Sequence, residues 1–304
     1  MPLSPGPQRA YPASRPRTWS SWPGRSRRDG AILFCGFPIR TAEDLDRFTH
    51  AFKLPQPHQE VGLSGKRSTL GGNVKTANEE PPHKVPDQGR QTPLLSTIEL
   101  YDRLREEVPE FVGKLITKGI IGRQYYTSKE NPEAKTVGWN WQVSYGFTIS
   151  AGDLVETQHR KVEEVLQTRL QKEAEWQSEN GTLHVLQRLP AFRRIASTGQ
   201  LVPFNGLVGV YGRQRDREAL ASPWRGSDGD IHLPTTYGHG TEIEREYLER
   251  LLEISDEIGF LVPWEEGDVA IVDNYTVQHA RSPWVRERSL LVSLWDGHEK
   301  FLPV

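Results

Sequence analysis

Apolar residues recur at helical spacing in two charged stretches of the chain. Between Asp153 and Trp176, leucines and valines fall three or four positions apart, and charged residues occupy many of the positions between them. The same period runs from Glu242 to about Ile258. A stripe of this kind buries one face of a helix and leaves the other face in water. We therefore expect both stretches to be scaffold helices that pack on a sheet.

Two further helices are predicted from their capping residues. Thr41 is followed by acidic residues, including Asp44, and this pattern indicates a helix that runs to about Phe52. The segment Ser96-Thr-Ile-Glu99 has the spacing of a capping box, and its helix should run to about Gly119. Pro109 lies inside that stretch, so we expect a break there.

Short apolar runs predict strands at both ends of the folded region. Residues 31–37 form one run and residues 267–277 form another. A turn over 281–287 and a return along 289–295 would make the second run one arm of a hairpin that closes a jelly roll. Residues 54–93 show no sustained period, and a loop of that length is usually functional or indicates that something is missing.

The overall composition is ordinary and carries no strong charge bias. Of the 304 residues, 36% are hydrophobic and 26% are charged, and the net charge is −2. Because both signs are interspersed, we expect neither nucleic acid nor a membrane as a partner. The apolar runs are also too short to span a bilayer. The single cysteine, Cys35, is expected to be a buried, inert thiol, which favours a reducing compartment and, by default, the cytoplasm.

The first 28 residues differ in composition from the rest. They contain six arginines, many prolines and serines, and no acidic residue. Such a start is typical of an organellar transit peptide, but the prolines would break the amphipathic helix that this kind of peptide needs. We therefore predict a disordered tail over residues 1–29, or a mis-assigned start of the reading frame, and one folded domain over residues 30–304.

His279 and Arg288 are the candidate chemical residues of the C-terminal hairpin. His279 ends the first arm, and Arg288 opens the second arm nine residues later. Antiparallel pairing would bring both side chains to one mouth of a barrel. An imidazole there can bind a metal, and a guanidinium can hold a carboxylate. On spacing alone, two unrelated surface residues are the more common explanation.

A series of short sequence words runs in one order along residues 30–296. The words are Gly30-Ala-Ile-Leu-Phe-Cys-Gly-Phe-Pro38, Thr76-Ala-Asn-Glu-Glu-Pro-Pro82, Gln91-Thr-Pro-Leu94, Phe204-Asn205, Tyr237-Gly-His-Gly240, Trp264-Glu-Glu-Gly-Asp-Val269, Asp273-Asn274 and His279-Ala-Arg-Ser-Pro283. Several words in sequence are more specific than any one of them. Together they resemble the TauD/TfdA-like dioxygenases, in the branch called clavaminate-synthase-like.

The resemblance implies a fold, a reaction and three site residues. The fold is α+β but mainly β, a double-stranded β-helix or jelly-roll barrel with flanking α-helices. The reaction uses Fe(II), O2 and 2-oxoglutarate as co-substrate to hydroxylate a small organic substrate, with release of succinate and CO2. His279 matches an iron-binding histidine, Arg288 an arginine that grips 2-oxoglutarate, and Thr92 a threonine that helps to hold it. Substrate identity and oligomeric state stay open.

The chain departs from the family pattern where the other two iron ligands should be. The iron site needs two histidines and one carboxylate. In the family, a His-x-Asp/Glu pair lies between two words that here run almost directly together, from Pro82 to Gln91. The chain is shorter at this junction by about a strand and a turn. A neighbouring strand should therefore lose its ladder partner and expose an edge.

The other histidines offer no clear replacement for the absent pair. The segment His58-Gln-Glu60 has the literal spacing, but we expect it in a solvated loop, and His83 is four residues from its closest acid. His232 and His239 are expected to be exposed. Three explanations stay open. The chain is a spliced or mis-assigned product of an active enzyme's gene, which we favour, or a pseudoenzyme or binding protein without turnover, or an oxygenase with an unorthodox site at His58/Glu60 or His83.

Overall fold

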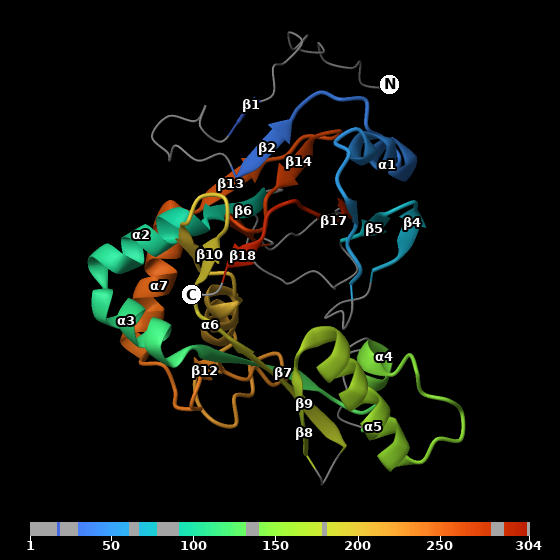
Figure 1. Cartoon of the computed structure of the whole chain (residues 1–304), viewed down its shortest axis with the longest axis vertical. Helices are drawn as coiled ribbons and strands as arrows, with labels where there is room; N and C mark the ends of the chain where they lie inside the picture. Colours follow the sequence, from blue (N-terminus) through green and yellow to red (C-terminus); the bar gives the residue numbers. More distant parts are fainter. Residues whose placement is uncertain are drawn as a thin grey trace, which may run out of the picture.

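The fold mixes helices with many short strands (Figure 1). The computed structural model describes residues 17–18, 30–60, 67–77, 91–131, 140–177, 181–280 and 289–302. Its helices are α1 (Ala42–His50), α2 (Thr97–Glu107), α3 (Pro109–Lys118), α4 (Trp141–Tyr145), α5 (Val155–Val165), the π-helix η2 (Leu166–Leu170), α6 (Leu207–Asp216) and α7 (Arg245–Ile258). None of the helices in these ranges has both the length and the apolar character needed to cross a membrane.

The strands are mostly two to four residues long. They are β1 (Arg17–Thr18), β2 (Ala31–Phe34), β3 (Gln56–Pro57), β4 (Thr69–Gly71), β5 (Val74–Thr76), β6 (Gln91–Ser96), β7 (Ile120–Tyr126), β8 (Glu173–Gln177), β9 (Thr182–Leu189), β10 (Arg193–Ile195), β11 (Leu201–Val202), β12 (Thr236–Tyr237), β13 (Phe260–Pro263), β14 (Val269–Val272), β15 (Val277–His279), β16 (Leu291–Ser293), β17 (Trp295–Asp296) and β18 (Phe301–Leu302). Apart from β1, the tail predicted over residues 1–29 lies outside the described residues.

The helix starts predicted from capping residues are confirmed. The Thr41 hydroxyl accepts a hydrogen bond from the Asp44 amide, and the Asp44 carboxylate accepts one from the Thr41 amide, so both ends of the capping box are in place at α1. The Ser96 hydroxyl caps α2 by accepting from the Glu99 amide. The break expected at Pro109 is confirmed as well, because α3 begins at that residue.

The helix predicted between Asp153 and Trp176 extends too far. α5 covers its middle, and η2 continues it to Leu170. Gln171 then takes a left-handed backbone conformation with a φ of 52°, which ends the helix. The next residues form β8, where pairing with β9 replaces helical hydrogen bonds. The other predicted stripe is confirmed: α7 ends at Ile258, as its period indicated.

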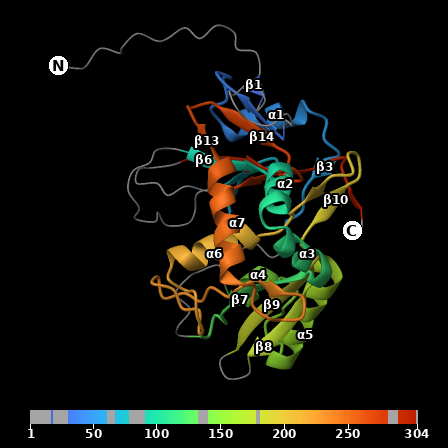
Figure 2. The ribbon, with the colours of Figure 1, turned by 90° about the vertical axis from the view of Figure 1, so that its left-hand side faces the viewer.

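Helices α2, α3, α6 and α7 pack around the largest cluster of buried side chains. Figure 2 shows α7 lying alongside α2, and α6 also packs on α7. The cluster includes Leu100, Leu104 and Phe111, each almost completely buried, and Phe111 stacks on the ring of Tyr247 with centroids 4.9 Å apart. This core closes against one end of β7 through Ile120.

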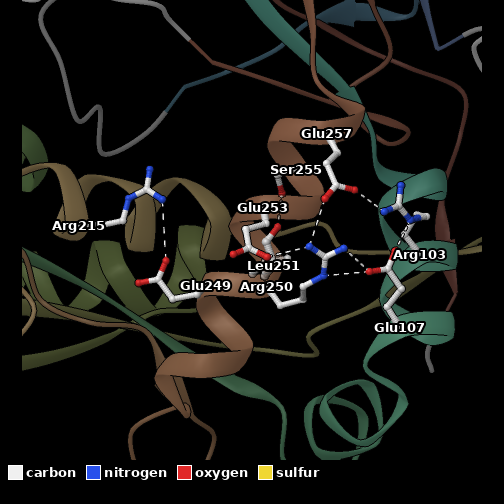
Figure 3. Close-up of polar contacts among 9 residues, drawn as sticks. All are labelled: Arg103, Glu107, Arg215, Glu249, Arg250, Leu251, Glu253, Ser255 and Glu257. Carbon is white, nitrogen blue, oxygen red and sulfur yellow. Dashed lines mark hydrogen bonds and ion pairs between the residues drawn. The ribbon is translucent and has the colours of Figure 1, made fainter.

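A network of charged side chains ties α2 to α7 on the outside of this core. Figure 3 shows Arg250 of α7 donating to Glu107 of α2, and Arg103 of α2 donating to Glu257 of α7. Arg103 and Arg250 also share Glu107 between them. Arg103 thus contacts two carboxylates and Arg250 contacts three, and the two helices are linked at both arginines.

The two longest strands, β7 and β9, pair within a sheet of the order β12-β7-β9-β8. α5 and η2 pack against it through a second buried cluster that contains Tyr126, Tyr145 and Leu166. The Tyr145 hydroxyl donates to the Tyr126 hydroxyl at 2.9 Å, so both buried phenols have a polar partner. This sheet and its helices hold η2 in place beside the other strands.

Three shorter sheets surround the end of β15. Their strand orders are β13-β6-β15, β16-β5-β4 and β1-β2-β14. Within the described residues, β14, β15 and β16 each have a strand partner on one side only. Among the described residues these strands form open sheets, and the predicted loss of a ladder partner stays a prediction.

The pairing predicted for the C-terminal hairpin is wrong. β15 pairs with β6 and β16 pairs with β5, so the two expected arms belong to different sheets. β14 also separates from β15, because the chain turns at Asp273, whose carbonyl accepts from the Val277 amide. Successive strands that cross between sheets are typical of a sandwich or jelly roll, in which neighbours along the chain are often not paired.

Gly238 lies where the loop after β12 touches the end of α3. Its amide donates to the Gly119 carbonyl at 3.0 Å. A Cβ atom at Gly238 would meet the Lys118 carbonyl oxygen at 2.1 Å, which is far inside contact distance. The backbones can approach this closely only because residue 238 has no side chain.

Candidate functional site

His279 stands at the last position of β15, beside the middle of β6. It pairs with Leu94 across the two strands, and Val277 pairs with Ser96 two residues earlier. The Ala280 amide continues the ladder by donating to the Pro93 carbonyl at 3.0 Å. Val277 and Leu94 are buried in one small cluster, so β15 is anchored up to the point where His279 emerges.

The protein around His279 favours the neutral imidazole. Although the residue keeps an exposed surface, the surrounding protein lowers the pKa of His279 below its ordinary value of 6.5, and the Arg67 guanidinium lowers it further. A neutral ring presents a nitrogen lone pair at neutral pH, which is the form that binds a metal or accepts a proton. His279 is therefore chemically suited to act as a ligand.

The other two residues of the expected site are only partly placed. Thr92 lies on β6, two residues before Leu94, and its backbone position pairs with Val262 of β13. Its strand is thus the immediate neighbour of the strand that carries His279. The Thr92 side chain and the whole of Arg288 lie outside the described residues, as do His83 and Asp87. Their expected roles therefore stay predictions.

Glu60 forms a buried ion cluster that the sequence did not predict. One carboxylate oxygen accepts from Arg67 at 2.7 Å, and the other accepts from Lys75 at 2.5 Å. The Glu60 side chain is only 9% exposed, so the expectation of a solvated loop is wrong for this residue. Two cations stabilise the buried carboxylate, as a charge in such a position requires. The one hint in the sequence was the long loop without a period.

His58 is engaged separately from Glu60. Its Nδ1 lies 2.8 Å from a carboxylate oxygen of Asp296, whose other oxygen accepts from Gln56 at 2.7 Å. These contacts join β3 to β17, which pair as a two-stranded sheet. Across the ranges that the structure describes, no group of three or more histidine, cysteine or acidic side chains could hold a metal ion. The substitute pair His58/Glu60 therefore gains no support.

A cavity of about 590 Å³ opens beside the ion cluster. Its wall is formed by residues 56–60, by Asn73 and Lys75 near β5, and by Arg169 of η2. Asn73 is fixed by hydrogen bonds to Leu294 and Ser293, so this side of the wall is built from the same strands that surround His279. The pocket is open to solvent rather than enclosed.

A family model matches most of the described site. It is the model of the taurine catabolism dioxygenase TauD, TfdA family, and it matches residues 82–295. The match includes β6, β15 and His279. The words before residue 82 lie outside it, although they contributed to the resemblance noted from the sequence.

Two relatives match nearly the whole chain. A clavaminate synthase-like protein of Arabidopsis thaliana is 27% identical over 290 residues, which cover 87% of this chain and 81% of the relative. The dapdiamide synthesis protein DdaC of Enterobacter agglomerans is 25% identical over 297 residues, which cover 88% and 82%. The first alignment is 290 positions long but includes only 87% of the 304 residues of this chain. The second is 297 positions long but includes only 88% of them. Each relative therefore has residues for which this chain has no counterpart.

Proposed function

The chain belongs to the taurine catabolism dioxygenase TauD, TfdA family, and from this premise we propose that it is a catalytically disabled form of a non-haem iron(II)/2-oxoglutarate oxygenase. Enzymes of this kind use iron to couple 2-oxoglutarate decarboxylation to oxidation of a small organic substrate by O2. The reaction class is the one that the family supports. The loss of turnover is our inference from the residues of this chain.

The observation that carries the proposal is that, among the described residues, no group of three or more histidine, cysteine or acidic side chains could hold a metal ion with His279. A stable iron site of this type needs two histidines and a carboxylate. The carboxylate of Glu60 is held by Arg67 and Lys75, and that of Asp296 is held by Gln56 and His58. Neither is available to a metal beside His279. The described residues therefore do not fit iron.

Two further observations support a missing segment. The strand edges of β14, β15 and β16 are open within the described residues, and a jelly roll of two full sheets would cover such edges. Both relatives contain residues that this chain lacks. In our proposal the absent residues lie between Pro82 and Gln91 and carry the His-x-Asp/Glu pair.

In the proposal, the site residues that this chain retains bind 2-oxoglutarate but do not activate oxygen. In the proposal, Arg288 holds the distal carboxylate of 2-oxoglutarate and Thr92 assists it, while the neutral His279 ring faces the same mouth. The register of β6 and β15 supports this placement, because it sets Thr92 and His279 on neighbouring strands. A single imidazole would hold iron too weakly to sustain turnover.

The test is an anaerobic titration with Fe(II) and 2-oxoglutarate. The readout is the visible charge-transfer band that 2-oxoglutarate gives when it is bound to iron. The comparison protein is the same chain with the corresponding segment of the Arabidopsis relative inserted between Pro82 and Gln91. We expect no band from the chain itself and a band from the extended protein that is lost in its His279→Ala variant. A band from the unextended chain would overturn the proposal.

A further inference from the structure

His159 of α5 is stacked on a tryptophan of the neighbouring sheet. Its ring lies parallel to that of Trp176 on β8, with 3.6 Å between the ring centroids and 10° between the planes. Trp141 of α4 meets the imidazole edge-on, with centroids 5.4 Å apart. Figure 1 shows α4 and α5 lying together beside β8 and β9. The imidazole is thus one member of a three-ring contact that joins the helix to the sheet.

Both indoles are held in place by their own N–H groups. The Trp176 Nε1–H donates to a carboxylate oxygen of Glu163 at 2.7 Å, and the Trp141 Nε1–H donates to the Gly181 carbonyl at 2.8 Å. The two rings therefore form a fixed surface. His159 is the one ring of the three that can change its charge near neutral pH.

His159 is also where the buried stripe of α5 begins. Val162 and Leu166 follow it three and seven residues later, and both are 0% exposed in the cluster under this helix. Residues at this spacing share one face of a helix. Leu154 and Val155, at the start of the helix, are 73% and 58% exposed. The first turn of α5 thus contributes little burial, and the stack at His159 is what holds this end on the sheet.

The surroundings of the ring favour its neutral form. Burial lowers the pKa of His159 below its ordinary value of 6.5, while the carboxylates of Glu163 and Glu156 on the same helix oppose this shift. α4 contributes no charged residue. On β8, the carboxylate of Glu175 faces His184 on the opposite side of the sheet. Within the described ranges, neither ring nitrogen of His159 forms a hydrogen bond.

We propose that His159 is a pH-sensitive latch, in which the neutral ring holds the start of α5 on β8 and the protonated ring releases it in mild acid. A charged imidazole between the two indoles loses water and gains no acceptor from them, because both indoles are hydrogen-bond donors. α5 continues into η2, whose Arg169 lines the cavity beside Glu60. Release of the helix would therefore loosen one wall of that cavity. The latch needs no metal, so the inference goes beyond the proposed oxygenase function.

The first test is an NMR titration of the full chain, with labelled histidine, from about pH 8 to about pH 5. The signal that is absent from His159→Phe assigns the resonance. We expect the His159 ring protons to be shifted upfield by the indole at high pH, to titrate with a midpoint below 6.5 and to lose the upfield shift on protonation. A midpoint above 6.5, or an upfield shift that persists in the charged ring, would overturn the inference.

The second test is hydrogen exchange of the α5 amides at the same two pH values, corrected for intrinsic exchange rates. A histidine whose pKa is lowered by folding costs stability below its unfolded pKa, so protection of α5 in the parent should fall by about 10-fold in acid relative to α7. His159→Phe, whose ring stacks without titrating, should keep its protection. His298→Gln, which alters an exposed histidine, should respond to acid like the parent.

A loss of protection that persists in His159→Phe would assign the response to another group and contradict the latch. His184 is the main rival, because it lies on the same sheet and burial lowers its pKa as well. The titration of the parent requires no folded variant for its midpoint and its ring shift. It therefore decides the question even where the phenylalanine variant does not fold.

Discussion

The helical side of the molecule and the side that carries His279 differ in how their cores are built. One continuous cluster of buried side chains joins α2, α3, α6 and α7, whereas the sheets around His279 divide their described buried residues between two smaller clusters. The helical side also has its ion network on the outside, as Figure 3 shows. The strands on the other side have open edges within the described residues.

In our proposal, this difference lies where the absent segment would be. Among the described residues, the smaller clusters belong to the strands next to the junction between Pro82 and Gln91, where the His-x-Asp/Glu pair is expected.

The largest expected effect comes from truncating a leucine in each region. Leu100→Ala removes a side chain that is 0% exposed in the helical cluster, and Leu94→Ala removes one that is 3% exposed beside His279. We expect losses in the free energy of unfolding of about 4–5 kcal/mol and about 2–3 kcal/mol, because neighbours at an open edge can relax into the space. Urea unfolding monitored by circular dichroism measures both. An equal or larger loss at Leu94 would contradict the comparison.

A smaller effect is expected from the ion network of the helical side. Hydrogen bonds from Arg250 and Arg103 lower the pKa of Glu107 below its ordinary value of 4.5. A carboxyl with a lowered pKa stabilises the fold above the pKa of the unfolded chain, and this contribution is lost as the pH falls through the lowered value. Glu107→Gln should therefore reduce the melting temperature at pH 7 by about 1–3 °C in low salt.

The control for this network is Glu106→Gln, which alters the exposed neighbour of Glu107 on the same helix. The control variant should melt within about 1 °C of the parent. The difference between Glu107→Gln and the parent should shrink in high salt and below pH 4.5, where the unfolded carboxyl is protonated. A difference that persists at low pH would mean that Glu107 acts through packing instead of charge.

The most specific expected effect concerns the pKa of His279. Since Arg67 contributes to the lowered pKa of His279, Arg67→Gln should raise that pKa, as measured by NMR titration of the imidazole protons. A histidine whose pKa is lowered by folding costs stability as the pH falls below its unfolded value, so the variant should lose less stability in mild acid. The exposed Arg40→Gln is the control. An unchanged titration would place Arg67 too far away to matter.

Local features of the fold could be predicted from the sequence because their causes are local. The caps at Thr41 and Ser96, the break at Pro109 and the end of α7 each depend on residues within one or two turns. The prediction of one helix between Asp153 and Trp176 was wrong for the opposite reason. Its last residues pair with β9, which is a partner that helical periodicity cannot reveal.

The candidate site residues came from family words and not from periodicity, and their roles stay predictions. His279 ends a strand as expected, but the strand beside it is β6, whereas spacing along the chain favoured a hairpin with the residues that follow. The cluster of Glu60, Arg67 and Lys75 needed long-range folding to assemble. His232 was expected to be exposed, yet its side chain is only 11% exposed and it bonds to Asp228.

Gly238 bears on whether a retained family word is evidence of selection for catalysis. The word Tyr237-Gly-His-Gly240 helped to identify the family. But a side chain at residue 238 would collide with the carbonyl of Lys118, so the need to fold is enough to preserve that glycine. A lineage could lose its chemistry early and still carry the word. Residues that the fold can spare, such as an exposed histidine at a strand end, are the ones whose retention bears on selection for turnover.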